Sequence, residues 1–202
     1  LGLACVGLWR LFSERSYDVA VVGADLQVGP PLRKLPTVLL GLAWLMSFVF
    51  ALGPEVWYDS LEYHLGLPYR FLMEGRVAVY PGQMYSHLPL NVEMLYTLAL
   101  AVHGPTLAKL VNWGLWMLLG CSIRRLGAEI VGSRAAAWAA AVVACTPAIF
   151  FNARVTGTEI ALTLWSVLAL VCGWRWMRTD EPRALILAGV FGGLAAGAKY
   201  AG

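Results

Sequence analysis

The sequence predicts an all-α fold, namely a polytopic transmembrane helical bundle with two interfacial helices in a long first outer loop. Hydrophobic residues make up 59% of the 202 residues and charged residues only 13%, against roughly 45–50% and about 25% in a soluble domain. The mean hydropathy is +0.67. These values exclude a water-soluble globule, a disordered chain and a disulfide-rich module. The remaining class is a multi-pass membrane protein.

Apolar runs of about 20 residues are long enough to cross a bilayer. We predict spans at residues 1–12 (partial), 35–52, 107–123, 135–151, 160–174 and 184–201. The sequence begins with Leu1 instead of Met and ends within an apolar run, so we expect residues 1–202 to be a single N-terminal transmembrane fragment. The cysteines lack a CxxC pair and are predicted to be small buried hydrophobes; they are Cys5, Cys121, Cys145 and Cys172.

The segment 89–103 is apolar but short, and the distribution of cations decides its topology. If it does not cross, ten Lys and Arg residues fall on one side and five on the other; if it crosses, the counts are seven and eight. Because cations concentrate on the cytoplasmic side, we predict that 89–103 lies at the outer interface. The protein is then integral to the cytoplasmic (inner) membrane, with an outer loop at 53–106 facing the periplasm.

Acidic residues concentrate in this outer loop. Six of the twelve acids lie outside, and five of those six are in the loop: Glu55, Asp59, Glu62, Glu74 and Glu93. Acids contribute little to topology, and long ordered loops usually carry function. Any chemistry of this chain is therefore expected in the loop.

Residues 57–76 are predicted to form an amphipathic interfacial helix that begins near Asp59. Pro68 removes one backbone donor and should kink or interrupt the helix, and Gly75 should end it. Helical spacing places a polar side opposite an apolar one. The polar side consists of Asp59, Glu62, Tyr63 and Arg70, and the apolar side of Leu61, Leu65, Leu72 and Met73.

Three acids of the loop are candidates for the site, and the first two have two interpretations each. Asp59 is either an N-terminal helix cap or a general base, since partial desolvation at a membrane surface raises a carboxyl pKa toward the working range. Glu62 is either a second acid of the site or a solvated side chain. Glu93 stands in an otherwise apolar helix and should face protein, water or a polar ligand instead of lipid.

Five further residues are candidates for the site. Tyr63, His64 and His87 are either interfacial anchors or site residues, and no HxxxH or HExxH spacing defines a metal. Glu159 either interacts with a helix dipole or faces the compartment of Asp59. Lys199 follows a glycine- and alanine-rich helix and either snorkels to the interface or holds a phosphate.

Several motifs resemble the bacterial C-type (GT-C) integral-membrane glycosyltransferases, the superfamily of protein mannosyltransferases and aminoarabinose transferases. The motifs of the first outer loop are Tyr58-Asp59-Ser60-Leu61-Glu62-Tyr63-His64-Leu65 with Pro68, Tyr85-Ser86-His87-Leu88-Pro89 and Glu93-Met94-Leu95-Tyr96. A Gly-Leu-Ala-x-Gly-x-Lys-Tyr pattern, from Gly193 to Tyr200, is similar to a later helix of the group. The loop lacks the paired Asp-Glu of some members.

This resemblance implies a glycosyltransferase that uses a polyprenyl-phosphate-linked sugar outside the cytoplasm. Asp59 then maps to the catalytic base and Glu159 to a second acidic position that is more often aspartate. Lys199 maps to a basic residue near the lipid phosphate, and we add Arg70 as a second candidate for that role. Glu62 and Glu93 are supporting acids.

The expected partners are the lipid-linked sugar, the bilayer and an acceptor that the sequence does not identify, with no nucleic acid. No cofactor is certain, although a divalent metal cation could bridge acids and phosphate. The alternative function is a membrane transporter or flippase for a lipid-linked or small solute, which would also use Glu93 and the helix-packing glycines. A non-catalytic membrane scaffold is a third interpretation.

Overall fold

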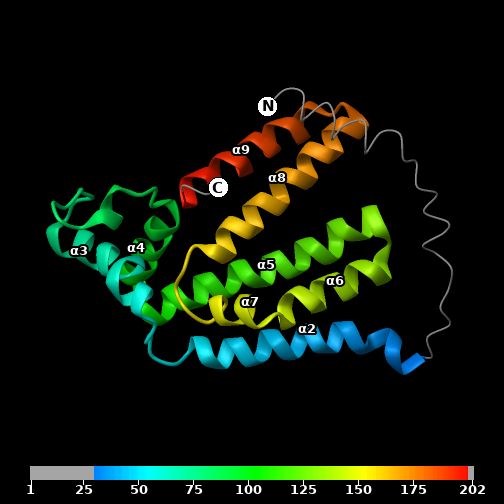
Figure 1. Ribbon diagram of the computed structural model, residues 1–202, viewed down its shortest axis with the longest axis horizontal. Helices are drawn as coiled ribbons and strands as arrows, with labels where there is room; N and C mark the ends of the chain where they lie inside the picture. Colours follow the sequence, from blue (N-terminus) through cyan, green and yellow to red (C-terminus); the bar gives the residue numbers. More distant parts are fainter. Residues whose placement is uncertain (1–29, 200–202) are drawn as a thin grey trace. The chain divides into compact units, whose positions relative to one another are not determined.

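The computed structural model describes residues 30–199, and every regular element in that range is a helix (Figure 1). The chain divides into two units, residues 1–33 and 34–202, and the account below concerns the second. The predicted partial span 1–12, Cys5 and the end of the predicted span 184–201 lie outside the described residues. The longer helices are α2 (Pro30–Ala51), α5 (Pro105–Val131), α6 (Ser133–Cys145), α8 (Glu159–Thr179) and α9 (Pro182–Ala198).

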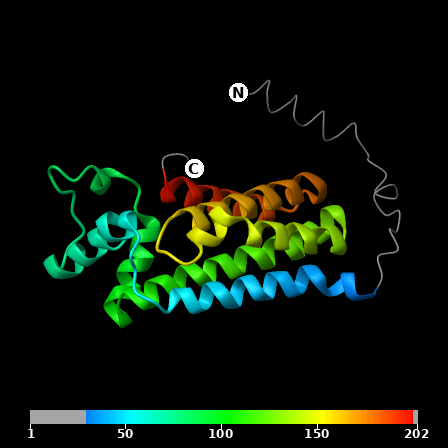
Figure 2. The same ribbon diagram turned by 60° about the horizontal axis from the view of Figure 1, so that its bottom comes forward.

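Helix α5 is the centre of the bundle. It packs against α6 on one side and α8 on another, and α8 lies along α9 (Figures 1 and 2). Trp116 and Leu119 of α5 are 1% exposed. At Gly120 the indole of Trp44 in α2 comes so close that an added Cβ would lie 2.8 Å from a ring carbon. The absence of a side chain at Gly120 is thus what admits Trp44 against α5.

Within residues 30–199, three helices are long and apolar enough to cross a membrane: residues 34–51 of α2, then α5 and α8. At 1.5 Å per residue, the 27 residues of α5 extend roughly 40 Å. Helices α6 and α9, with 13 and 17 residues, are apolar but shorter. The protein is a membrane protein with an all-α bundle, and the division into five complete spans stays a prediction.

The continuous helix expected over 135–151 is two helices in the structure. Helix α6 ends at Cys145, and α7 (Pro147–Asn152) starts after Thr146, whose backbone is extended with ψ 122°. Pro147 has no N–H to continue the ladder, and a proline forces the preceding residue out of the helical region. The interruption therefore follows from the sequence itself.

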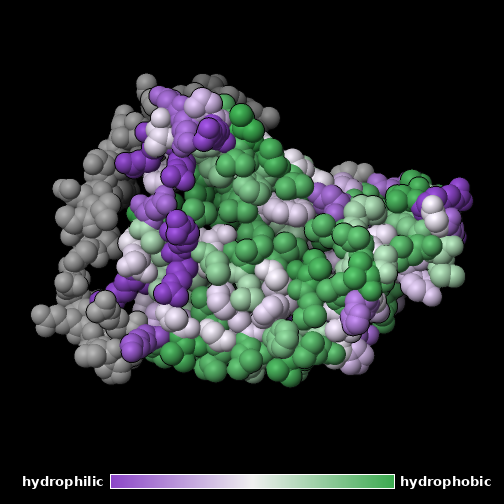
Figure 3. Space-filling model, turned by 180° about the vertical axis from the view of Figure 1, so that it is seen from behind, coloured by the Kyte–Doolittle hydropathy of each residue, from purple (hydrophilic) through white to green (hydrophobic). Residues whose placement is uncertain are grey.

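The surface between the ends of the bundle is largely hydrophobic (Figure 3). Large apolar side chains on α2, α8 and α9 are exposed, among them Leu45, Leu170 and Ile186 at 60%, 74% and 65%. The prediction of buried cysteines is wrong here: Cys121 and Cys145 are exposed and Cys172 is partly exposed, all as free thiols. In a membrane helix an apolar side chain needs no protein cover, so apolar sequence does not distinguish a lipid-facing position from a buried one.

The loop region, residues 53–104, lies at one end of the bundle (Figures 1 and 2). It contains η1 (Ser60–His64, a π-helix), α3 (Gly66–Glu74), η2 (Met84–His87, a 3-10 helix) and α4 (Asn91–His103). The predicted helix start near Asp59, interruption before Pro68 and end at Gly75 are all confirmed, with Gly75 left-handed at φ 66°.

The interruption takes the form of a π-helical turn. Leu65 donates its N–H to the carbonyl of Ser60, five residues back, at 2.7 Å. A Cβ on Gly66 would lie 2.6 Å from the carbonyl oxygen of Leu61, so only glycine fits at this position. An extra residue in one turn rotates all later side chains about the helix axis. This explains why Leu61 is exposed and Leu65 is buried; Leu72 and Met73, both in α3, are exposed as well, so the predicted apolar side is not buried as a unit.

Helix α4 is shorter than a membrane span, since 13 residues extend about 20 Å. It packs against α5 and α3 through Val92, Tyr96 and Ala99, whereas Leu98 and Val102 on its other side are exposed. The interfacial placement of 89–103 stays a prediction. Its apolar outer side is what a helix at the membrane boundary requires.

Candidate active site

A buried histidine–glutamate pair joins η1 to α4. His64 Nδ1 lies 2.7 Å from Glu93 Oε1, and both side chains are 2% exposed. The indole of Trp57 stacks on the His64 ring at 6.1 Å between centroids, and the Tyr63 ring lies 4.0 Å away on centroids. Among the described residues, His64 Nε2 and Glu93 Oε2 have no hydrogen-bond partner. Glu93 therefore faces protein, as expected for an acid in an apolar helix.

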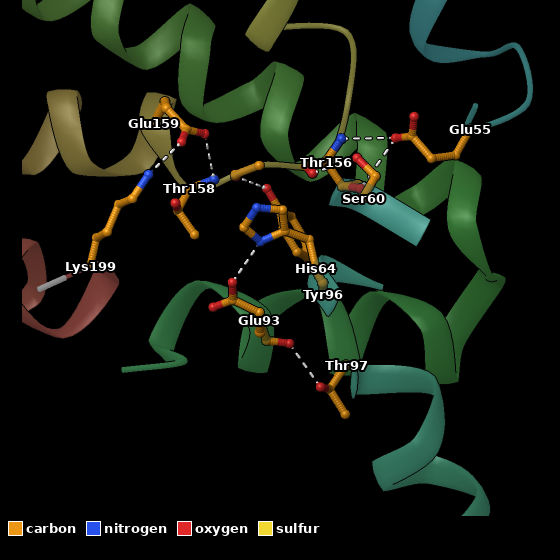
Figure 4. Close-up of polar contacts among 11 residues, drawn as sticks. Glu55, Ser60, His64, Glu93, Tyr96, Thr97, Thr156, Thr158, Glu159 and Lys199 are labelled. Carbon is orange, nitrogen blue, oxygen red and sulfur yellow. Dashed lines mark hydrogen bonds and ion pairs between the residues drawn. The ribbon is translucent and has the colours of Figure 1, made fainter. Parts of the chain in front are cut away.

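The connection between α7 and α8 is tied to the beginning of the loop region (Figure 4). Ser60 donates its hydroxyl to the carbonyl of Thr156 at 2.7 Å. Glu55 Oε2 accepts from the backbone N–H of Thr156 at 2.9 Å and from its hydroxyl at 3.2 Å. The hydroxyl of Tyr96 in α4 donates to the carbonyl of Gly157 at 2.6 Å. Hydrogen bonds therefore connect three parts of the chain: residues 55–64, Tyr96 of α4, and residues 156–157.

An ion pair lies next to this connection. Lys199 Nζ, just after α9, is 3.0 Å from Glu159 Oε1 at the start of α8, with side-chain exposures of 47% and 36%. Glu159 Oε2 also accepts the backbone N–H of Thr158 at 3.1 Å. Glu159 therefore accepts a backbone N–H at the start of α8, and its placement in the compartment of Asp59 stays a prediction. A Cβ on Gly157 would lie 2.8 Å from Glu159 Oε2, so glycine leaves room for the carboxylate.

Asp59 and Tyr63 complete the group. The pKa of the Tyr63 phenol is raised, chiefly by burial and further by the negative charges of Asp59 and Glu159. Tyr63 thus lies within electrostatic range of both acids, and its ring stacks on Tyr85 at 4.0 Å. Asp59 is half-buried and makes no side-chain capping hydrogen bond. Asp59 thus stands at the N-cap position of η1 without a capping hydrogen bond, and its role as a general base stays a prediction.

Three further predicted site residues are exposed: Glu62, Arg70 and His87. Arg70 donates to Glu74 at 3.0 Å, and its guanidinium lies 3.7 Å from the centroid of the Tyr80 ring. The hydrogen bond from Arg70 lowers the pKa of the Glu74 carboxyl. Within residues 30–199, no three His, Cys, Asp or Glu side chains lie close enough together to hold a metal ion.

Sequence reasoning did not nominate Glu55, Ser60, Thr156 or Tyr96. Glu55 was one of the acids of the loop, but nothing in its neighbourhood identified Thr156, 101 residues later, as its partner. The run Thr156-Gly157-Thr158 carried a weak signal, since three small residues between apolar helices are typical of a tight connection. Their hydrogen bonds attach the beginning of the loop region and α4 to the connection between α7 and α8.

One comparison with known proteins bears on the site. Residues 107–202 match the family model of the dolichyl-phosphate-mannose-protein mannosyltransferases. The match extends from α5 to the end of the chain and includes Glu159 and Lys199, but not the loop region. No match was found among curated proteins or among solved structures. The resemblance predicted from the sequence is thereby confirmed over residues 107–202, and the match supports a membrane glycosyltransferase of the GT-C type at family level.

Proposed function

We propose that this GT-C glycosyltransferase moves a sugar from a polyprenyl-phosphate donor to an acceptor on the outer side of the cytoplasmic membrane. The observation that carries the proposal is the convergence of a half-buried acid with an ion pair. Ser60, next to Asp59, donates its hydroxyl to the carbonyl of Thr156, in the connection that leads to Glu159, and Glu159 is paired with Lys199. A base and a cation near each other suit a displacement that removes a proton on one side and releases an anion on the other.

In this mechanism the Asp59 carboxylate is the general base. It accepts the proton of the acceptor hydroxyl while the hydroxyl oxygen forms a bond to the anomeric carbon. The bond between the anomeric carbon and the phosphate oxygen breaks, and polyprenyl phosphate leaves with the bonding electrons. General-base assistance of this kind contributes about 10²–10⁴-fold to rate. Asp59 is suited to it because no capping hydrogen bond occupies its carboxylate.

Lys199 is the proposed ligand of the leaving phosphate. An ammonium group has three donors, one of which points to Glu159, and the side chain is 47% exposed. Glu159 would then orient Lys199 instead of touching the sugar. Arg70, with a side chain that is 53% exposed, is a second phosphate ligand, provided that it leaves Glu74. A divalent cation shared by Glu159 and the phosphate would add charge stabilisation, and loss of transfer in EDTA with recovery in Mg²⁺ or Mn²⁺ would support that.

Replacement of the proposed base tests the function directly. Asp59→Asn removes the proton acceptor at constant size, and we expect transfer from polyprenyl-phosphate mannose to fall by about 10²–10⁴-fold at normal expression. Glu129→Gln makes the same chemical change at an exposed position near the end of α5 and should leave transfer unchanged. Full activity of Asp59→Asn would overturn the base assignment.

Topology has a separate test. Met84 is 69% exposed in the loop region and Ser133 is exposed at the start of α6. Single cysteines at these positions, in a background without the native cysteines, should react with an impermeant maleimide from outside at residue 84 and from inside at residue 133. Outside labelling at residue 133 would mean that 89–103 crosses the bilayer.

Transport is the competing function, and it predicts movement of solute without chemical change. Glu93 was its main support, but this acid is paired with His64 and 2% exposed. Counterflow of labelled polyprenyl-phosphate mannose in proteoliposomes, with the sugar still attached to the lipid, would favour transport over transfer.

A further inference from the structure

The His64–Glu93 pair has features that stability alone does not explain. It is a direct bond of 2.7 Å between two side chains that are each 2% exposed, yet each side chain retains one polar atom without a partner among the described residues. Buried polar atoms without partners are unfavourable. An apolar pair of similar volume is often at least as stabilising as a buried charged one. The pair therefore contributes little to the stability of the fold, but its hydrogen bond fixes the orientation of the two side chains.

Its position in the chain suggests what it directs. His64 is the last residue of η1, and Asp59 immediately precedes η1. Ser60, next to Asp59, is held by the carbonyl of Thr156, and His64 is held by Glu93 of α4. The short helical segment that carries Asp59 is thus attached at one end to the α7–α8 connection and at the other to α4. With both attachments in place, Asp59 has a fixed position relative to Glu159.

We propose that His64 and Glu93 form a positioning dyad that holds Asp59 in the geometry required for sugar transfer. The inference rests on the proposed function of Asp59 as base. The hydrogen bond at Nδ1 fixes the plane of the imidazole, and Trp57 stacks on the ring at an interplanar angle of 26°. The segment η1 is a π-helical turn, a rare geometry that is found frequently at functional sites. Neither residue of the dyad contacts substrate in this proposal.

A double apolar variant separates positioning from stability. His64→Leu with Glu93→Leu removes the directional bond and leaves no buried group unpaired, so the thermal midpoint should stay within a few degrees of wild type. Because a small misplacement of a catalytic group costs up to about 100-fold, we expect kcat for polyprenyl-phosphate mannose to fall tenfold to 100-fold. The KM for the donor should change less than twofold.

Two single variants complete the design. Glu93→Gln keeps an oxygen acceptor for Nδ1 and should retain kcat within about threefold. Ser86→Ala is the matched control, since Ser86 is buried in the loop region and bonds only within its own turn, to Tyr80 and Gln83; its kcat should equal wild type. Wild-type kcat in the double Leu variant, or loss of kcat in Glu93→Gln equal to that in the double variant, would overturn the dyad.

A spectroscopic measurement decides the question without substrate. Two spin labels report the distance between η1 and α8, one at Leu61, which is 53% exposed, and one at Thr163, which is exposed. The four native cysteines are replaced by serine in this background. The distance distribution should broaden in the double Leu variant and not in Ser86→Ala. An unchanged distribution would overturn the dyad. Full activity of Asp59→Asn, by contrast, would refute the base assignment and leave this distance result standing.

Discussion

Two lysines near the loop region are used in opposite ways. Lys109 of α5 is 3% exposed, and its ammonium group donates to the carbonyls of Phe50, Gly53 and Pro54 at 3.0–3.3 Å. Lys199 is 47% exposed and makes one ion pair, with Glu159. Because an ammonium group has three donors, Lys109 has none left for a ligand and Lys199 has two. A lysine whose three donors all bind backbone carbonyls caps the end of a helix. A lysine with unused donors can bind an anion.

The largest effect on stability is expected at Lys109. Lys109→Met keeps the length of the side chain but removes the lysine donor from the carbonyls of Gly53 and Pro54 and one of two donors from that of Phe50, at a cost of about 3 kcal/mol. Thermal unfolding in detergent, followed by circular dichroism, measures the loss. If Lys199→Met is destabilised as much as Lys109→Met, the contrast between the two lysines is wrong.

Of the two lysines, Lys199 is expected to have the larger effect on activity. Removal of one preorganised donor from a developing anion costs about 10²-fold or more in kcat, so Lys199→Met should lose about 100-fold in transfer from polyprenyl-phosphate mannose. Its unfolding free energy should change by less than about 1 kcal/mol, because the ion pair with Glu159 is half exposed. Unchanged transfer in this variant would remove Lys199 from the site.

A smaller effect is expected from crowding of α9 against α4. Asn91 donates to the carbonyl of Leu194 at 2.8 Å, and a Cβ on Gly197 would lie 2.6 Å from Asn91 Nδ2. Gly197→Ala should therefore move Lys199 and reduce transfer about tenfold, with a destabilisation of about 1–3 kcal/mol. Gly193→Ala is the matched control, since nothing lies within 4 Å of its added Cβ. If the two variants show equal transfer, the contact between Gly197 and Asn91 does not determine the position of Lys199.

The smallest effect concerns the exposed pair of Arg70 and Glu74. The pKa of Glu74 in the folded protein lies below its ordinary value of 4.5, so its contribution to stability is present above pH 4.5 and is lost as the pH falls through the folded pKa. Glu74→Gln should differ slightly from wild type at neutral pH and lose that difference in acid. Thermal midpoints across a pH series test this, and a difference that grows in acid would reverse the assigned shift.

Local features of the site could be predicted from the sequence, and its long-range pairings could not. The start near Asp59 and the end at Gly75 followed from proline, glycine and acid positions, and the break before Pro147 was available from the same proline rule. Glu93 was recognised as an acid that must avoid lipid, but several polar groups could have paired with it. Glu93 pairs with His64, which is 29 residues away in the sequence, and this pairing depends on the packing of α4 next to η1. The π-helical turn also escaped prediction, since helical periodicity assumes 3.6 residues per turn.

The hydrogen bonds that fix residues 50–55, at the beginning of the loop region, affect the entropy of substrate binding. Phe50, Gly53 and Pro54 are fixed by Lys109, and Glu55 is fixed by Thr156. Ordering the backbone of one residue costs about 1–2 kcal/mol of conformational entropy. Here that ordering accompanies folding, so a ligand of the candidate site meets residues 50–55 in an already fixed conformation. Its affinity is then not reduced by the need to immobilise those residues.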